Sequence, residues 1–477
     1  MINRRQFLGH MGVLTAGALL PLRLLAAAEP DVVVIGAGLS GLYAAELLEA
    51  AGLKVQVLEA RDRIGGRLYT LDDVAGHPEA GGQTVGPTYG RLIFTALKHG
   101  VELKPMAYTP GSEPVAQIMD IAGQRLLPDQ WPDSALNPLP PSLRQLPPDQ
   151  ALLQLLGDAG FETADDWLSA DYAYLDRSLG AYLREQGVSD RAVELLGVNS
   201  NYGRNLDETS LLAMQRVKML LLQGFATPGG YKVVAGGNQR LPEVMADKLA
   251  TPVLRGKVVK SISRKGVGME VACEDGSTYQ PRFVLSTLPL PALRNVDIRP
   301  GLPDLQAEAV REVAYGRVLQ LHLSVTRPFW QGSGFMPNVW SDGAIERVFA
   351  TDPRETGQPT NLTIWINGQG VERFDGLAES AVEAAVMDDF HRAMPEAKGG
   401  AKVEKVWSWE SSRFSGGSFA NWLPGQIARY GNAVAESHGN LFFAGEHTAR
   451  WASGMEGALE SGERAANEIL ARNRQTT

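Results

Sequence analysis

Short apolar runs, separated by glycine-rich turns and helical patterns, begin the chain after residue 29. Residues 31–35 read Asp-Val-Val-Val-Ile, a continuous apolar run of the length of a buried strand. A glycine-rich turn follows, a helical pattern begins at Leu42, and a second strand pattern covers residues 54–58. Strand, helix and strand in this order predict an α/β unit with a parallel sheet.

Segments with an α/β pattern alternate along the rest of the chain with two segments of a different pattern. Strand-like runs at 257–263, 268–273 and 282–287 continue the α/β style, as does the apolar run 440–444 with the helical pattern after it. Helical patterns between 149 and 222 form one interruption, which follows a stretch with seven prolines between Pro128 and Pro148. Alternating strand patterns at 318–325 and 338–366 form the other.

This alternation of segments predicts two interleaved domains in an α/β fold. We expect a Rossmann-like, dinucleotide-binding domain with a parallel sheet of the glutathione-reductase type, assembled from residues 29–97, 230–300 and 415–477. An α+β domain that carries the substrate is expected from residues 98–229, mostly helical, and 301–414, a sheet with helices.

The first glycine-rich turn has the features of a dinucleotide site. Gly36, Gly38 and Gly41 follow the first strand, and Glu59 follows the second strand. Such a turn lets the backbone approach a pyrophosphate at the positive end of a helix. A carboxylate at the position of Glu59 can accept hydrogen bonds from ribose hydroxyls. The spacing therefore predicts a bound dinucleotide.

The segment after Glu59 favours FAD over NAD. Residues 61–67 read Arg-Asp-Arg-Ile-Gly-Gly-Arg, and this run resembles the second phosphate-binding segment of the monoamine oxidase family of flavoproteins. The resemblance adds Arg61, Gly66 and Arg67 to the cofactor site. A basic surface loop is the alternative interpretation.

The N-terminus resembles an export signal. Arg4 and Arg5 precede a short apolar stretch, and Ala26-Ala27-Ala28 comes before Glu29. Paired arginines followed by Phe-Leu resemble the signal of the twin-arginine route, which carries folded proteins. We expect residues 1–28 to be a signal peptide recognised by the twin-arginine machinery, and a periplasmic or exported protein. An uncleaved membrane anchor is the alternative, against which the shortness of the apolar stretch argues.

The composition of the chain argues against nucleic acid as a partner, against a disulfide and against a metal site. The chain has 477 residues and a net charge of −9, which offers no basic field for nucleic acid. Cys273 is the single cysteine, so no intramolecular disulfide forms. The seven histidines show no ligand-like spacing, and we expect no metal site.

Five motifs together resemble the flavin monoamine oxidase and amino acid oxidase superfamily. They stand in the family's order at 36–67, 81–87, 285–289, 409–430 and 443–464. The resemblance implies FAD across the first domain, with cofactor contacts at Gly36, Gly38, Gly41, Glu59, Arg61, Gly66, Arg67, Gly82, Gln83, Val258, Trp409, Gly445, Glu446, Gly454 and Met455. It also implies removal of a hydride from a carbon that bears an amine, followed by hydrolysis of the imine.

Two departures from the family concern the flavin and the substrate walls. Residues 415–419 read Ser-Gly-Gly-Ser-Phe, with serine where animal monoamine oxidases attach FAD through cysteine, so we predict noncovalent FAD. The resemblance implies that Phe419 forms one of the family's two aromatic walls in front of the flavin. The opposite wall falls at Gly454, which leaves it open or filled by Trp451 or a substrate ring. Core packing is the alternative role of both aromatic residues.

A third departure concerns electron flow. Gln320 stands where the family usually places a lysine near the flavin that is linked to the reaction with oxygen. A neutral amide does not stabilise superoxide as an ammonium does. Electrons could therefore pass to O2 or to a periplasmic acceptor such as a cytochrome c.

The fourth departure concerns the substrate. Thr84 stands where many L-amino acid oxidases place an arginine that clamps the carboxylate, which favours amines without an α-carboxylate. Arg204, Arg216 or Arg317 could supply a clamp instead, so an L-amino acid oxidase is the second hypothesis. Tyr202 and Gln215 are weaker candidates for substrate contact. A non-catalytic flavin-fold binding protein is the third hypothesis. The sequence leaves open whether the protein forms a homodimer.

Overall fold

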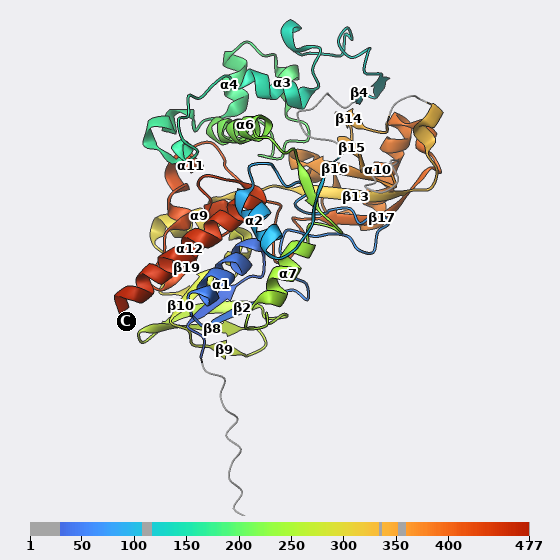
Figure 1. The fold of residues 1–477 in the computed structure, drawn as a ribbon. Coiled ribbons are helices and arrows are strands. Elements are labelled where there is room, and N and C mark those ends of the chain that lie inside the picture. Colours follow the sequence, from blue (N-terminus) through green and yellow to red (C-terminus); the bar gives the residue numbers. More distant parts are fainter. Residues whose placement is uncertain (1–28, 107–116, 333–335, 352–358, 477) are drawn as a thin grey trace, which may run out of the picture.

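The computed structural model describes residues 29–106, 117–332, 336–351 and 359–476 (Figure 1). The export signal predicted for residues 1–28 lies outside these ranges. No helix within them combines the length and the apolar character that crossing a membrane requires.

A four-stranded parallel sheet forms the centre of the first domain. Its order is β19 (Leu441–Phe443), β10 (Phe283–Ser286), β1 (Val32–Ile35) and β2 (Val55–Leu58). Neighbouring parallel strands need long crossover connections, and large insertions can be accommodated in these. The sheet accordingly draws strands from three separated parts of the chain. The predicted fold class, α/β with a Rossmann-like parallel sheet, is confirmed.

Strand β1 is buried on both faces. Val32 and Val34 pack in one core with helices α1 (Leu39–Ala50) and α12 (Gly454–Thr476), which lie side by side in Figure 1. Val33 and Ile35 point into a second core on the opposite face. The continuous apolar run of β1 follows from this double burial.

A second sheet covers that opposite face. Its order is β11 (Asp297–Arg299), β7 (Val259–Lys265), β8 (Gly268–Cys273) and β9 (Thr278–Tyr279). The predicted runs at 257–263 and 268–273 therefore belong to this sheet, while the run at 282–287 forms β10 of the parallel sheet.

A seven-stranded sheet forms the centre of the second domain. Its order is β17 (Ala401–Ser408), β13 (Val318–Val325), β16 (Asn361–Asn367), β15 (Arg347–Thr351), β14 (Val339–Ser341), β4 (Ile118–Ile121) and β5 (Gln124–Leu126). Helix α10 (Glu379–Ala393) packs on it through Val382, Val386 and Phe390. The strands β4 and β5 show that the region predicted as mostly helical also completes this sheet.

The described part of that region also contains four α-helices: α3 (Pro148–Leu155), α4 (Leu179–Glu185), α5 (Asp190–Leu196) and α6 (Leu211–Ala226). Ser178, Ser189 and Ser210 cap the last three, because each hydroxyl accepts a hydrogen bond from a backbone N–H in the first turn. The proline-rich stretch before them contains one short 3₁₀ turn, Pro141–Leu143.

Shorter elements connect these layers. They are α2 (Gly90–Lys98), α7 (Arg240–Lys248), α8 (Leu290–Leu293), α9 (Asp304–Glu312), α11 (Gln426–Tyr430), β3 (Leu103–Pro105), β6 (Lys232–Val234), β12 (Ala314–Tyr315) and β18 (Ala420–Asn421). Strand β3 pairs with β6, and β12 pairs with β18.

Candidate active site

A cavity of about 760 Å³ lies between the two domains, bounded by the carboxyl ends of β1 and β2 and by residues of β13 and β16. Ligands of doubly wound α/β sheets bind at this edge of the strands. The predicted site residues that line the cavity are Gly36, Gly38, Glu59, Arg61, Gly66, Arg67, Gly82, Gln83, Thr84, Tyr202, Val258, Gln320, Trp409, Phe419, Gly445, Glu446, Gly454 and Met455. Gly41, Gln215 and Trp451 do not line it.

The turn between β1 and α1 needs its glycines. Gly36 has a φ of +109°, and a Cβ there would lie 2.5 Å from Oγ1 of Thr287. A Cβ on Gly41 would lie 2.1 Å from the carbonyl oxygen of Gly36. Gly41, predicted as a cofactor contact, does not line the cavity and instead allows α1 to pack closely against the turn. The open backbone before α1 suits a pyrophosphate.

Glu59 is held at the end of β2 by two backbone amides. Its side chain accepts hydrogen bonds from the N–H of Ala37 and the N–H of Arg61, both at 2.9 Å. Each carboxylate oxygen can accept more than one hydrogen bond. Glu59 is 4% exposed and lines the cavity, so its carboxylate can accept hydrogen bonds from the hydroxyls of a ribose bound there.

Arg67 and Glu446 form a partly buried pair beside the cavity. Nη1 of Arg67 lies 3.3 Å from Oε1 of Glu446 and donates to the carbonyl of Ser418 at 2.9 Å. Burial lowers the pKa of Arg67, but the Glu446 carboxylate outweighs this effect, so the pKa of Arg67 is raised overall. The guanidinium remains charged at any physiological pH.

The second oxygen of Glu446 offers a test of cofactor fit. Oε1 accepts a hydrogen bond from the N–H of Ala420 at 2.7 Å, whereas Oε2 is buried with no hydrogen-bond partner among the described residues. An unpaired buried acceptor is costly unless a ligand satisfies it. A hydroxyl of the ribityl chain of FAD would do so. The residues around the cavity therefore fit FAD.

The small-residue loop at 80–83 is supported from behind. Nε1 of Trp409 donates to the carbonyl of Ala80 at 2.6 Å. Nδ2 of Asn238 donates to the carbonyls of Gly82 and Gln83, both at 2.8 Å. Asn238 is 1% exposed, and its positioning role was not predicted. Its place in the Gly-Gly-Asn turn at 236–238 was the sole sequence signal.

Nine residues form what we call the substrate end of the cavity: Thr84, Tyr89, Asn201, Tyr202, Val318, Gln320, Trp365, Phe419 and Gly454. The rings of Tyr202 and Phe419 lie 5.8 Å apart between centroids at an angle of 50°. Gln320 is buried on β13, which pairs with β16 so that Gln320 lies beside Trp365. Tyr89, Asn201 and Trp365 were not predicted as site residues, because no sequence motif carries them.

Two predicted site residues have other roles. Trp451 is 47% exposed and does not line the cavity, so its ring does not fill the wall at Gly454. Gln215 donates through Nε2 to the carbonyl of Leu156 at 2.6 Å and holds two parts of the helical region together. Both predictions of a place in the substrate site are corrected.

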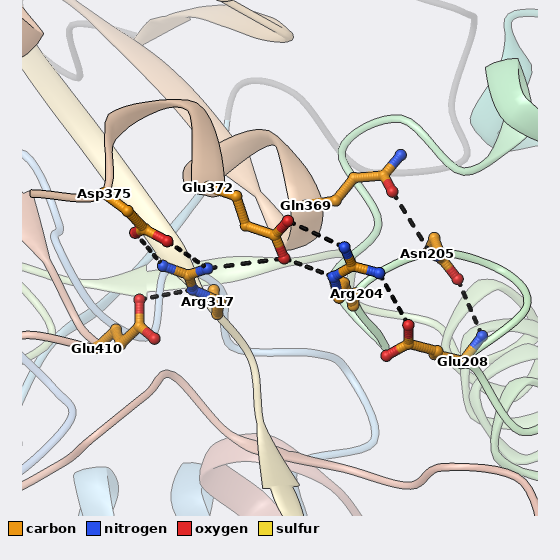
Figure 2. Close-up of polar contacts among 8 residues, drawn as sticks. All are labelled: Arg204, Asn205, Glu208, Arg317, Gln369, Glu372, Asp375 and Glu410. Atoms are coloured by element: carbon orange, nitrogen blue, oxygen red, sulfur yellow. Dashed lines mark hydrogen bonds and ion pairs between the residues drawn. The ribbon is translucent and has the colours of Figure 1, made fainter.

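The arginines considered as carboxylate clamps are also engaged elsewhere. Figure 2 shows Arg204 between Glu208 and Glu372, and Arg317 surrounded by Glu372, Asp375 and Glu410. Neither arginine lines the cavity. Their charge is neutralised by four carboxylates outside the site.

Arg216 lies partly buried against the loop that precedes α12. Its Nη2 donates to the carbonyls of Ala449 at 3.3 Å and Ala452 at 2.5 Å, and its guanidinium lies 3.9 Å from the ring centroid of Trp167. Burial lowers the pKa of Arg216 to about 10. Arg216 does not line the cavity and holds the backbone that leads to Gly454.

Covalent attachment of FAD through cysteine is excluded by position. Cys273 is buried on β8 and does not line the cavity. Since it is the single cysteine of the chain, no thioether can form at the site, in accord with noncovalent FAD.

The chain matches known proteins over nearly its whole length. The model of the flavin containing amine oxidoreductase family matches residues 39–470. A flavin-containing amine oxidase of Oncorhynchus mykiss is 27% identical over 463 residues, which cover 92% of this chain and 85% of that protein. A flavin-containing amine oxidase B of Mus musculus is 27% identical over 458 residues, covering 93% and 86%.

Solved structures agree with the fold. Cyclohexylamine oxidase from Brevibacterium oxydans IH-35A is 25% identical with a TM-score of 0.77, covering 94% of this chain and 100% of that chain. Wild-type putrescine oxidase bound to putrescine is 22% identical with a TM-score of 0.75, covering 93% and 99%. The cavity, its fit to FAD and the match over residues 39–470 together show that the chain belongs to the flavin-containing amine oxidoreductase family and is an FAD-dependent amine oxidoreductase.

Proposed function

We propose that this protein oxidises a primary or secondary monoamine that carries no α-carboxylate. The product is an imine, which water hydrolyses to an aldehyde or ketone. The observation that carries the proposal is that the nine described residues of the substrate end include no arginine, lysine, aspartate or glutamate. Arg67 and Glu446, which contact the backbone on either side of Phe419, pair with each other.

Uncharged walls select against a second charge on the substrate. Even a neutral polar group that is buried without a hydrogen-bond partner costs about 2–7 kcal/mol, and a buried carboxylate without a partner costs more. The same argument disfavours a second ammonium group, because no carboxylate belongs to the substrate end. Aromatic rings at Phe419 and Tyr202 instead offer apolar area to the body of the amine.

FAD, when bound, supplies the hydride acceptor of the reaction. The protein's own residues orient the amine between the aromatic rings and exclude water from the reacting carbon. Trp409, Asn238 and Met455 hold or border the small-residue loop that would lie against the flavin.

Anaerobic reduction of the flavin tests the proposal. The holoenzyme is mixed without oxygen with amines and with the α-amino acids that match them, and the visible absorbance is followed. Bleaching by the amines alone supports the proposal. Bleaching by the amino acids would establish an L-amino acid oxidase, and bleaching by no compound of either class would favour a non-catalytic binding protein.

Electron transfer to O2 or to an exported carrier such as a cytochrome c completes the proposed cycle. The neutral Gln320 in front of the neutral His322 leaves no cation at this position to stabilise superoxide. Comparing the reoxidation rate of the reduced enzyme in air and with cytochrome c distinguishes the two acceptors.

Export in the folded state is the remaining part of the proposal. It rests on Arg4 and Arg5 and the short apolar stretch after them. Replacing both arginines by lysine should retain the protein inside the cell, as cell fractionation would reveal. Light scattering of the purified holoenzyme tests whether it is a homodimer.

A further inference from the structure

We infer that Tyr89 forms the wall of the substrate end that Gly454 leaves open, and that this tyrosine sets the size of amine the enzyme accepts. The inference rests on the proposed function, because it assumes that an amine binds between Phe419 and this wall. It names a determinant of substrate size in that site.

The open wall is a local property of Gly454. Gly454 has no side chain, lines the cavity, and has a φ of +55°, which disfavours any residue with a Cβ. The atom nearest to the position of its missing Cβ is the hydroxyl oxygen of Tyr89, at 3.5 Å. Tyr89 therefore occupies the space that a larger side chain at 454 would take.

The ring of Tyr89 packs against the backbone of Gly86. A Cβ on Gly86 would lie 3.2 Å from Cε1 and 3.3 Å from Cδ1 of Tyr89, so the ring packs directly over that glycine. Burial raises the pKa of Tyr89, and the nearby Tyr202 adds to this rise. The phenol is therefore neutral and presents an uncharged surface.

The carboxylate of Glu456 links the segment of Gly454 to the segment of Tyr89. Glu456, two residues after Gly454, accepts hydrogen bonds from the backbone N–H of Arg91 at 3.0 Å and of Leu92 at 3.1 Å. These amides belong to the first turn of α2, which Tyr89 precedes. The start of α12 and the start of α2 are thus joined through one buried side chain, which restrains the backbone next to Tyr89 relative to Gly454.

Phe419 and Tyr202 stand in contact as one aromatic pair of the substrate end, and Tyr89 also lines it. Close packing in protein interiors means that a bulky ring at such a wall limits the width of a ligand. Shortening Tyr89 should therefore widen the substrate end without touching the cofactor contacts of Glu59, Arg67 or Glu446.

Two amines that cannot be oxidised test the inference. The carbon that bears the nitrogen has no hydrogen in tert-butylamine and in 1-adamantylamine, so both compounds report binding alone, one small and one bulky. Their dissociation constants are measured from the change in flavin absorbance of the holoenzyme. The variants are Tyr89→Ala and Tyr89→Leu, with Tyr174→Ala as the control because Tyr174 is 69% exposed.

The dissociation constant of 1-adamantylamine relative to that of tert-butylamine should fall about tenfold in Tyr89→Ala. A smaller fall is expected in Tyr89→Leu, which retains an apolar side chain over Gly86, and no change in the control. An unchanged ratio in both Tyr89 variants, with both probes bound, would overturn the inference and leave the proposed function intact. If neither probe bound to the wild type, the proposed amine pocket would fail, and this inference with it.

Discussion

The carboxamide oxygen of Gln320 lies 3.3 Å from Nε2 of His322, and Nδ1 of the same imidazole lies 3.2 Å from the hydroxyl of Thr363. Gln320 and His322 are 1% and 0% exposed. If Nε2 carries the imidazole proton, it donates to Gln320 and directs the amide N–H group of Gln320 away from His322. Gln320, which lines the cavity, and His322 lie on the same face of β13 and thus form a buried, uncharged pair.

The charge at position 320 should control the rate of reoxidation by air. In Gln320→Lys, an ammonium beside the flavin would stabilise developing superoxide, and we expect reoxidation by O2 to become about tenfold faster. Stopped-flow mixing of the reduced enzyme with oxygenated buffer measures this rate. Gln320→Met, similar in length and uncharged, is the matched control. Equal rates in the lysine and methionine variants would show that charge at 320 does not govern the choice of acceptor.

His322 should make stability fall in mild acid. Burial lowers the pKa of His322 from 6.5 to about 4. Between these pH values the unfolded chain binds a proton that the folded chain excludes, so stability is complete above pH 6.5 and decreases as the pH falls toward 4. The decrease is ~3 kcal/mol at most.

Comparison with His322→Gln isolates this effect. Carboxylates and His447 titrate in the same range and contribute equally to both proteins. Midpoints of urea unfolding at pH 7 and pH 5 should therefore differ less in His322→Gln than in the wild type. Identical differences in the two proteins would mean that His322 is protonated in the fold or neutral in both states.

Glu446 should hold FAD through the oxygen that lacks a protein partner. Glu446→Gln weakens the pairing with Arg67 and replaces one acceptor by a donor, so we expect FAD to bind about 10- to 100-fold more weakly. The fluorescence of FAD released on dilution measures the loss. Glu463→Gln, which removes a surface partner of Arg91, should leave FAD affinity unchanged. Tight FAD in Glu446→Gln would argue against this contact.

Arg216 should stabilise the loop before α12 through its geometry as well as its charge. Lysine lacks the planar fork that stacks on Trp167 and donates to the carbonyls of Ala449 and Ala452. We expect Arg216→Lys to lose about 2 kcal/mol of stability, visible as a lower midpoint of thermal unfolding. Arg204→Lys, in the exposed network of Figure 2, should change the midpoint little. Equal changes in both variants would contradict the role assigned to Arg216.

The amino-acid sequence alone predicted the local features of the chain. The turn at Gly36 and the carboxylate of Glu59 lie within one strand–helix–strand unit, where the spacing between elements is nearly constant. Apolar runs likewise predicted β1, β2 and β10, because strands buried on both faces leave a continuous signal. The interleaving of the two domains followed from the return of that signal at the end of the chain.

Contacts between distant segments were not readable in this way. Asn238 donates to the carbonyls of Gly82 and Gln83 from a position more than 150 residues away, and the Gly-Gly-Asn turn that contains it does not identify these partners. Trp451 was expected in the site because it precedes Met455 closely. Its N–H is bound by Glu460 of α12, and its ring lies at the surface.

The sequence by itself determined the fold class, the cofactor turn and the family, because these depend on periodicity and on short spacings within single elements. Only the tertiary structure decided which side chains line the substrate end of the cavity. Tyr89 meets Gly454 because Glu456 joins two helices whose residues lie more than 360 positions apart. Arg204, Arg216 and Arg317 are excluded from the cavity because other partners already hold them. Such choices depend on packing among remote segments, which a linear pattern does not encode.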